Sequence, residues 1–280
     1  MLVGAHISIG GSIDMAVDRA LKLGCNTFQI FTRNPRGWQQ SPLTEESIQL
    51  FRKKLSSSNL MLPLIHMPYL PNIASPVDQT YNRSVEVLTE ELRRSSLLAV
   101  PYVVTHVGSH LGSGIKRGMA RVVDACNKAL ELSGGSSTIL LENTAGTRNS
   151  VGSTFEHLSE MIRRIKPQER IGICLDTCHA FAAGYDLRTV YDVRHTLELL
   201  HSIIGIDFLK AVHVNDSKGS LGEGLDRHEH LGMGQIGEGG LRAFLNQKPL
   251  TKVPTIIETP IDGRRDDVGN LKKLRELIQN

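Results

Sequence analysis

The chain of 280 residues has little cysteine, few aromatic side chains and no long apolar run. Its four cysteines (Cys25, Cys126, Cys174 and Cys178) form no Cys-x-x-Cys pair. This argues against a disulfide framework and favours reduced thiols in a cytoplasmic protein. The first residues enter a strand pattern at once, so we expect neither a signal peptide nor a membrane span. The formal net charge of +3 does not by itself indicate a nucleic-acid partner.

Short apolar runs alternate with amphipathic segments along the whole chain. Strands are expected at 2–7, 27–31, 62–66, 102–105, 138–141, 171–175, 211–212 and 255–257. Helices are expected at 13–23, from Thr44 onward, and at 77–98, 115–132, 155–165, 187–203, 241–245 and 268–278. Eight strands alternating with eight helices predict an α/β fold, a (β/α)8 TIM barrel formed as one domain over residues 1–280.

The expected strands end on side chains of the types that bind metal ions. Six apolar runs stop at such a residue, and further candidates follow closely, Asp226 and His228 alternating onto one side of an extended segment. The nine candidates are His66, His106, Glu142, Asp176, His179, His213, Asp226, His228 and Glu258. Barrel geometry places the carboxyl ends of all strands on one face, so these scattered residues should converge there.

Nine ligand candidates exceed what a single zinc ion uses, because zinc takes four ligands and a catalytic site leaves one position open. Two or three metal ions are therefore indicated. The mixture of nitrogen and oxygen donors favours zinc or manganese over calcium or magnesium. Closely spaced ions suit an in-line displacement at phosphorus, so hydrolysis of a phosphate ester is the first reaction class to consider.

Three motifs resemble the endonuclease IV family of apurinic/apyrimidinic endonucleases. They are Gly-Ile-Cys-Leu-Asp-Thr-Cys-His at 172–179, His213-Val-Asn-Asp-Ser-Lys leading to Asp226-Arg-His228, and His66-x-x-Tyr69-Leu70-x-Asn72. The resemblance covers essentially the whole chain. It implies a trinuclear zinc barrel that hydrolyses the phosphodiester 5′ to an abasic site in double-stranded DNA, leaving a 3′-hydroxyl and a 5′-deoxyribose phosphate, with 3′-end trimming as a side activity.

The resemblance also implies a role for each candidate. His66 and His106 would bind one zinc, which Glu142 would bridge to a second. Asp176, His213 and Glu258 would complete the second site, while His179, Asp226 and His228 would hold the third; manganese is an alternative metal. Glu142 would in addition position or activate the attacking hydroxide, which makes it the expected catalytic residue.

Three further residues match the positions that this family inserts into DNA. Arg36 lies in the loop after the second strand, and Tyr69 and Leu70 lie just past His66. Such side chains would fill the stack that a displaced sugar-phosphate vacates. Pro68 and Pro71 depart from the family pattern around this pair. The expected partner is therefore abasic duplex DNA, bound by a monomer.

Two other functions fit parts of the same pattern. A sugar isomerase or epimerase of the xylose-isomerase-like barrels would need only Glu142, Asp176, His213 and Glu258, leaving the other five ligand candidates unexplained. A non-catalytic binder of damaged DNA would not need the ligand set at all.

Several other residues have weaker claims to function. Gly232-x-Gly234-x-x-Gly237 matches a dinucleotide fingerprint by letter, yet no βαβ unit contains it, so we predict a flexible active-site loop. His230 alternates in phase with His228 and could compete with it as a ligand. The roles of His6 and His110 stay open, and Cys174 and Cys178 are expected to be packing residues.

Overall fold

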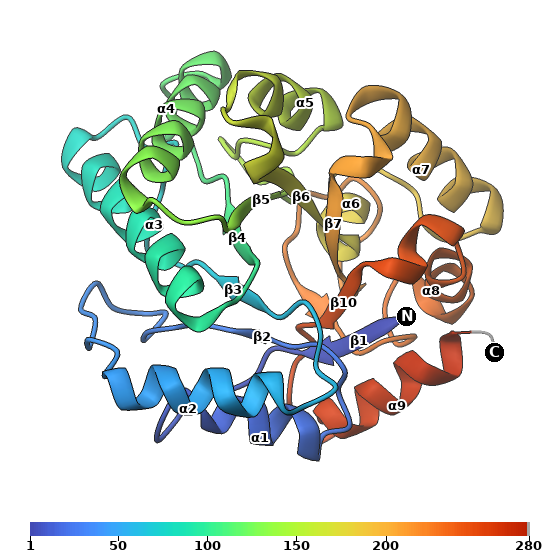
Figure 1. Cartoon of the computed structure of the whole chain (residues 1–280). Helices are drawn as coiled ribbons and strands as arrows, with labels where there is room; N and C mark the ends of the chain where they lie inside the picture. The colour runs from blue at the N-terminus through green and yellow to red at the C-terminus, as the bar shows by residue number, and fades with distance from the viewer. Residues whose placement is uncertain (279–280) are drawn as a thin grey trace.

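A computed structural model describes residues 1–278, and eight of its strands form one parallel sheet that curls into a nearly closed barrel (Figure 1). The sheet order is β1-β10-β7-β6-β5-β4-β3-β2. The two ends of this order meet through a parallel bridge between His6 and Gln29, where the Ile7 N–H donates to the Gln29 carbonyl at 2.7 Å. The barrel strands are β1 (Leu2–Ala5), β2 (Gln29–Ile30), β3 (Leu64–His66), β4 (Tyr102–His106), β5 (Thr138–Glu142), β6 (Ile171–Asp176), β7 (Leu209–His213) and β10 (Pro254–Ile257).

Helices surround the strands on the outside, except for the short helix α6 (Thr177–Ala182), whose residues are all buried (Figure 1). They are α1 (Met15–Lys22), α2 (Glu45–Ser56), α3 (Asp78–Leu98), α4 (Ile115–Ser133), α5 (Phe155–Arg164), α6 (Thr177–Ala182), α7 (Val190–Ile203), α8 (Gly237–Leu245) and α9 (Asp267–Leu277), with short 3-10 turns η1 (Gln168–Arg170), η2 (Ile206–Phe208) and η3 (Lys248–Lys252). Thr44 caps α2 as predicted, since its side chain accepts the Ser47 N–H. None of the helices within 1–278 is both long enough and apolar enough to cross a membrane.

The (β/α)8 prediction is confirmed, but two segments differ from the expected pattern. The six-residue helix α6 follows β6 without a loop, because the Asp176 side chain caps it by accepting the His179 N–H at 2.7 Å. The segment after β7 forms a small antiparallel pair, β8 (Asp216–Ser217) with β9 (His228–Glu229). Both elements are too short to produce a hydrophobic period.

A layer of small and medium apolar residues fills the barrel interior. It consists of Leu64, Val104, Leu140, Cys174, Ala211 and Ile256, all fully buried. Each of these residues lies two positions before a predicted metal ligand at the end of its strand. Because strand side chains alternate with a period of two, the ligand candidates must point into the barrel directly above this layer. The alternation that builds the core therefore also builds the floor of the site.

Candidate metal centre

The nine predicted ligands meet at the C-terminal end of the barrel. Six of them are the last residue of a strand or the first position beyond one, and the others come from α6 and the segment that forms β9. By element they are His66 (β3), His106 (β4), Glu142 (β5), Asp176 (β6), His179 (α6), His213 (β7), Asp226 (before β9), His228 (β9) and Glu258 (after β10).

Glu142 lies at the centre of the group, completely buried. Its Oε2 lies 3.2 Å from His66 Nε2 and 3.0 Å from His106 Nε2. Its Oε1 lies 3.1 Å from His213 Nδ1 and 3.3 Å from His179 Nδ1. Burial would raise the pKa of this carboxyl, but the imidazoles of His106 and His213 hold the pKa well below its usual value. Glu142 is therefore an anion at neutral pH.

The ligand atoms fall into overlapping groups, within each of which all lie less than 4.8 Å apart. One group is His66, Glu142 and His213, one is Glu142, Asp176, His213 and Glu258, and one is His179, Asp226 and His228. His106 joins the first through its contact with Glu142. Glu142 belongs to two groups, as a bridging carboxylate would.

The hydrogen bonds leave ring nitrogens facing carboxylates. His66 Nδ1 lies 2.7 Å from the Met67 carbonyl, which assigns it as the donor and leaves Nε2 with a lone pair. His228 Nδ1 likewise donates to the Glu258 carbonyl at 3.0 Å. His228 Nε2 is then buried without a hydrogen-bond partner among the described residues, 3.7 Å from Asp176 Oδ2 and 3.8 Å from an Asp226 oxygen. Lone pairs directed at carboxylates fit a bound cation.

The electrostatic field of the site also favours positive charge. Burial acts to lower the pKa of His179, yet the carboxylates of Asp176, Asp226 and Glu142 raise that pKa well above its usual value. The reciprocal effect lowers the pKa of Asp226 to about 2 despite its partial burial.

Two cysteines border the site. Cys178 lies in a fourth group with Asp176 and His228. Burial, helped by the charge of Asp176, raises the pKa of the Cys178 thiol to about 12, and burial raises the pKa of the Cys174 thiol to about 11. Both pKa values disfavour the thiolate that a metal would need, which agrees with the packing role expected for them.

The structure separates the remaining histidines. His230 is fully buried away from the ligand groups, with Nε2 3.0 Å from Asp262 and Nδ1 2.9 Å from the Asn270 amide, so it does not compete with His228. His110 Nδ1 accepts the N–H groups of Gly112 and Gly114 and shapes its own loop. His6 lies at the edge of the site, 3.5 Å from Glu258 Oε1.

The glycine-rich segment 232–237 is not free, contrary to the predicted flexible loop. The buried carboxylate of Asp216 accepts the N–H groups of Gly232 and Gly234 at 3.0 Å, and those of Ile236 and Gly237 at 3.0 and 3.3 Å. A Cβ on Gly234 would lie only 2.5 Å from Asp216 Oδ1, so the close approach requires glycine there. These amides bind an anion of their own chain rather than a nucleotide phosphate.

Replacing this carboxylate should destabilise the fold. We expect Asp216→Ala to lower the free energy of unfolding by about 3 kcal/mol or more, because it leaves several buried or partly buried amides without an acceptor. Urea denaturation followed by circular dichroism measures the change. Asp207→Ala, at an exposed position in η2, is the control and should change stability by no more than about 0.5 kcal/mol. Equal stability of the two variants would contradict the role assigned to Asp216.

Two asparagines that the sequence analysis missed fix Asp176 in place. The Asp176 N–H donates to Asn143 Oδ1 at 2.7 Å, and the Asn143 side chain returns a bond to the Asp176 carbonyl. Asn215 Nδ2 donates to Asp176 Oδ2 at 2.7 Å, while Asn215 Oδ1 accepts the Glu258 N–H. Such supporting amides orient ligand carboxylates.

An open cavity of about 630 Å³ lies above the ligands. Arg36 and Tyr69 line it, together with two cations not singled out from the sequence, Lys218 and Arg227. The Tyr69 N–H donates to the Pro35 carbonyl at 3.2 Å, which joins the segment after β3 to the loop that carries Arg36. Tyr69 is 61% exposed and Leu70 41% exposed, so two adjacent large side chains offer apolar surface beside the site.

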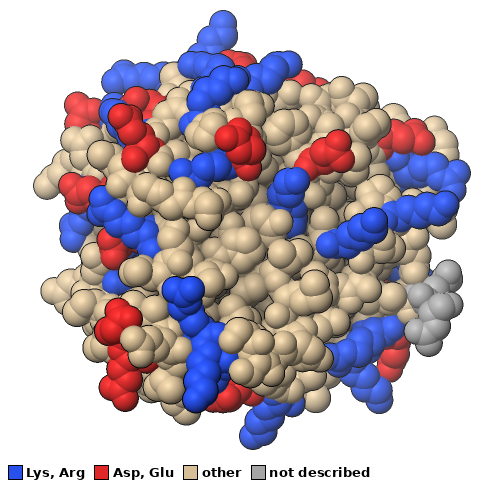
Figure 2. Space-filling model, in the orientation of Figure 1, with Lys and Arg blue, Asp and Glu red and all other residues tan. Residues whose placement is uncertain are grey.

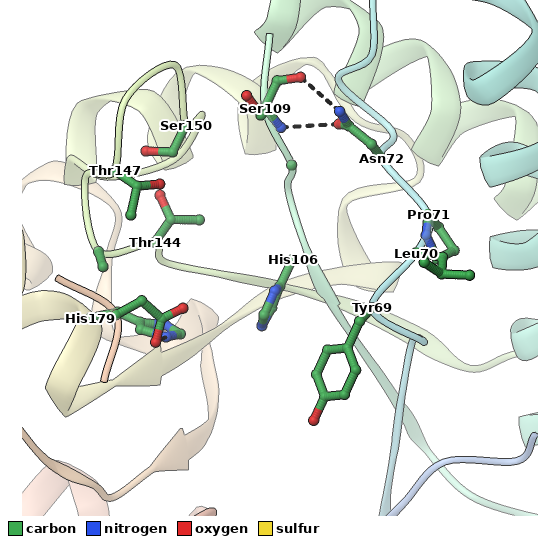
Figure 3. Close-up of a pocket in the computed structure, with 13 residues that line it drawn as sticks. Tyr69, Leu70, Pro71, Asn72, His106, Ser109, Thr144, Thr147, Ser150 and His179 are labelled. Carbon is green, nitrogen blue, oxygen red and sulfur yellow. Dashed lines mark hydrogen bonds and ion pairs between the residues drawn. The ribbon is translucent and has the colours of Figure 1, made fainter. Parts of the chain in front are cut away.

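A second, adjoining cavity of about 270 Å³ shares Tyr69, His106, His179 and Asp226 with the first (Figure 3). Tyr69 and Leu70 lie on one side of it, and Thr144, Thr147 and Ser150 on the other, with His106 between them (Figure 3). Asn72 fixes the first side by accepting the Ser109 N–H and donating to the Ser109 carbonyl. The apolar wall and the hydroxyl-rich wall thus face each other across the entrance to the metal centre.

Figure 2 shows how charged side chains are distributed over one face of the molecule. Acidic and basic side chains are interspersed around its rim, and its centre carries few of either. It offers no continuous basic surface to a polyanion.

The barrel and the convergent imidazoles and carboxylates define a (β/α)8 enzyme with a metal-type site at the C-terminal ends of its strands. Residues 17–280 match the family model described as xylose isomerase-like TIM barrel. The chain is 54% identical over 278 residues to "Probable endonuclease 4" of Methanoculleus marisnigri, covering 99% of both chains. The protein belongs to the endonuclease IV family.

Solved structures agree with this placement. The crystal structure of endonuclease IV from Thermus thermophilus matches with a TM-score of 0.89 and 36% identity, covering 99% of this chain and 98% of that one. A D-tagatose 3-epimerase-like protein matches with a TM-score of 0.76 at 22% identity, covering 99% and 97%. At that identity the second match reflects the shared barrel fold alone.

Proposed function

We propose that this protein is a DNA-repair endonuclease that hydrolyses the phosphodiester 5′ to an abasic site in duplex DNA, with 3′-end trimming as a side activity. The observation that carries the proposal is the juxtaposition of a dense ligand cluster with the exposed pair Tyr69 and Leu70 at its entrance. A ligand cluster of this kind can bind the metal ions that catalyse hydrolysis at phosphorus, and the exposed pair can fill the space left by a missing base. Family membership points in the same direction.

We infer three zinc ions at the site, with manganese as an alternative. The donor groups support one ion at His66, His106 and Glu142, a second at Glu142, Asp176, His213 and Glu258, and a third at His179, Asp226 and His228. When bound, such ions lower the pKa of water and neutralise charge on the reacting phosphate.

The side chains of the chain itself then have separate tasks. Glu142, ionised and central, orients the attacking water along the line of displacement. Arg36 lies where it can pair with a DNA phosphate, and Tyr69 and Leu70 can stack in the vacated space.

The sugar-isomerase alternative is less well supported. It needs only the group formed by Glu142, Asp176, His213 and Glu258. It gives no role to the third group, whose His228 nitrogen is oriented toward two carboxylates.

The test is incubation of the purified protein with a duplex carrying one abasic site. A single cut that leaves a 3′-hydroxyl and a 5′-deoxyribose phosphate supports the proposal. An identical duplex without the lesion is the control. DNA binding without a cut would favour a non-catalytic binder, whereas turnover of ketose sugars with no cut would favour the isomerase.

Tyr69 should contribute to recognition of the lesion. We expect Tyr69→Ala to reduce the preference for abasic over intact duplex by about tenfold or more, because stacking of an aromatic ring contributes about 1–3 kcal/mol per base. Binding titrations with both duplexes measure this ratio. Tyr191→Ala is the control, since Tyr191 is 78% exposed on α7. If Tyr69→Ala keeps both its metal content and its ratio of affinities for abasic and intact duplex, Tyr69 has a purely structural role.

We also infer a cytoplasmic monomer whose residues 1–280 form one barrel domain; residues 279–280 lie outside the described part. All four cysteines are free and buried, which supports a reducing compartment. Sedimentation velocity of the purified protein tests the oligomeric state.

A further inference from the structure

Gln29 is a fully buried polar side chain at the seam of the barrel. It begins β2 and bridges to His6 at the end of β1, so it lies where the first and last strands of the sheet order meet. Sequence motifs did not single it out, because glutamine is not a typical metal ligand and the strand around it is apolar. A buried carboxamide must have its hydrogen bonds satisfied, and its partners here are all at the metal centre.

The carboxamide makes three contacts. Gln29 Oε1 lies 2.8 Å from His213 Nε2. Gln29 Nε2 lies 2.6 Å from Glu258 Oε1 and 3.0 Å from His6 Nδ1. The two amide hydrogens and the oxygen are thereby all used, by side chains from three different strand ends.

Only one orientation of the amide fits these partners. A flipped amide would place its oxygen against the Glu258 carboxylate, and would direct N–H groups at a ring nitrogen of His213. With the amide as placed, His213 must carry its proton on Nε2. In the neutral form that can bind a metal ion, Nδ1 then has the lone pair, and it lies 3.1 Å from Glu142 Oε1 and 3.2 Å from Glu258 Oε2.

We propose that Gln29 is a positioning residue of the metal centre, one that fixes the tautomer of His213 and the rotation of the Glu258 carboxylate toward a shared divalent cation. The inference rests on the proposed metal-dependent function. Two ligands of the same group are held by one rigid amide, so their geometry is set before the ion arrives. Gln29 would act through these two ligands and would not bind the ion itself.

The variant that tests this is Gln29→Met, which keeps the length and volume of the side chain but removes all three hydrogen bonds. We expect its affinity for zinc at one of the sites to fall by about 10- to 100-fold, the usual effect of losing a residue that supports a ligand. Competition with a chromogenic chelator gives the affinity, and elemental analysis gives the number of ions retained. The absorption spectrum of the cobalt-substituted protein reports the altered geometry directly.

Asn270→Leu is the matched control. Asn270 is another fully buried amide that contacts a histidine, with Nδ2 2.9 Å from His230 Nδ1, but it lies outside the ligand groups. It should lower thermal stability while leaving zinc affinity and the cobalt spectrum unchanged. A purely structural role for Gln29 would make the two variants behave alike, and that result would overturn the proposal.

A measurement on the unaltered protein does not depend on how the variants fold. Nitrogen-15 NMR of the zinc-loaded protein should show His213 protonated at Nε2 and not at Nδ1. The opposite tautomer would overturn the proposal. If the protein does not cut abasic DNA but Gln29→Met still loses an ion, the proposed function fails and the positioning role stands. If the protein cuts abasic DNA but Gln29→Met binds zinc as tightly as wild type, the proposed function stands and the positioning role fails.

Discussion

Glu142→Gln should reduce incision of abasic DNA by about three orders of magnitude or more, while the protein stays folded. The fully buried carboxylate contacts four imidazoles and belongs to two ligand groups. The pKa of Glu142 is held well below its usual value, so the wild-type side chain is an anion throughout the neutral range. A neutral amide keeps the volume but loses the negative charge, and only one of its two terminal atoms, the oxygen, can bind a cation.

Single-turnover cleavage of an abasic duplex measures the effect, with circular dichroism as the check on folding. Elemental analysis should show loss of ions as well, since one carboxylate supports two sites. Glu238→Gln removes the same charge from surface ion pairs with Arg242 and Lys273 and should cut normally. Turnover close to that of wild type in Glu142→Gln would exclude Glu142 from the mechanism.

Much of the barrel can be predicted from sequence because its signals are local. Each inner-layer residue, such as Leu140, and the ligand candidate two positions later, here Glu142, occupy the same face of one strand. The same few residues therefore predict both the strand and the metal ligand at its end. The convergence of the six strand-end candidates follows from parallel topology, whereas His179, Asp226 and His228 reach the site through α6 and the β9 segment.

The residues that support the ligands could not be predicted in this way. Gln29 and Glu258 are separated by 229 positions, and no local pattern marks an amide as the partner of a carboxylate that far away. The choice between His228 and His230 also lies beyond a period-two pattern, which gives both the same face. It is decided by Asn270 and Asp262, which engage His230 from α9 and from the segment after β10.

Prolonged treatment with a chelator should abolish incision completely, because the proposed hydrolysis requires metal ions bound by the ligand groups. Without cations the group of Glu142, Asp176 and Glu258 retains three carboxylates whose ligand atoms lie within 4.8 Å. Loss of ions that bind only the folded protein should lower the midpoint of thermal unfolding by at least about 5 °C, since a ligand at a hundred times its Kd contributes about 2.7 kcal/mol.

During chelation the most exposed ion should be lost first and the buried ions later. Asp226 has a side chain 47% exposed, whereas Glu142 and His213 are fully buried, so the ion at His179, Asp226 and His228 is the most accessible to a chelator. Elemental analysis at successive times, paired with cleavage assays and calorimetry, follows the loss, and zinc added back should restore both activity and thermal midpoint. Full incision by protein shown to be metal-free would refute the metal-dependent mechanism. Loss of the buried ions first would instead mean that exposure of the ligands does not control the order of release.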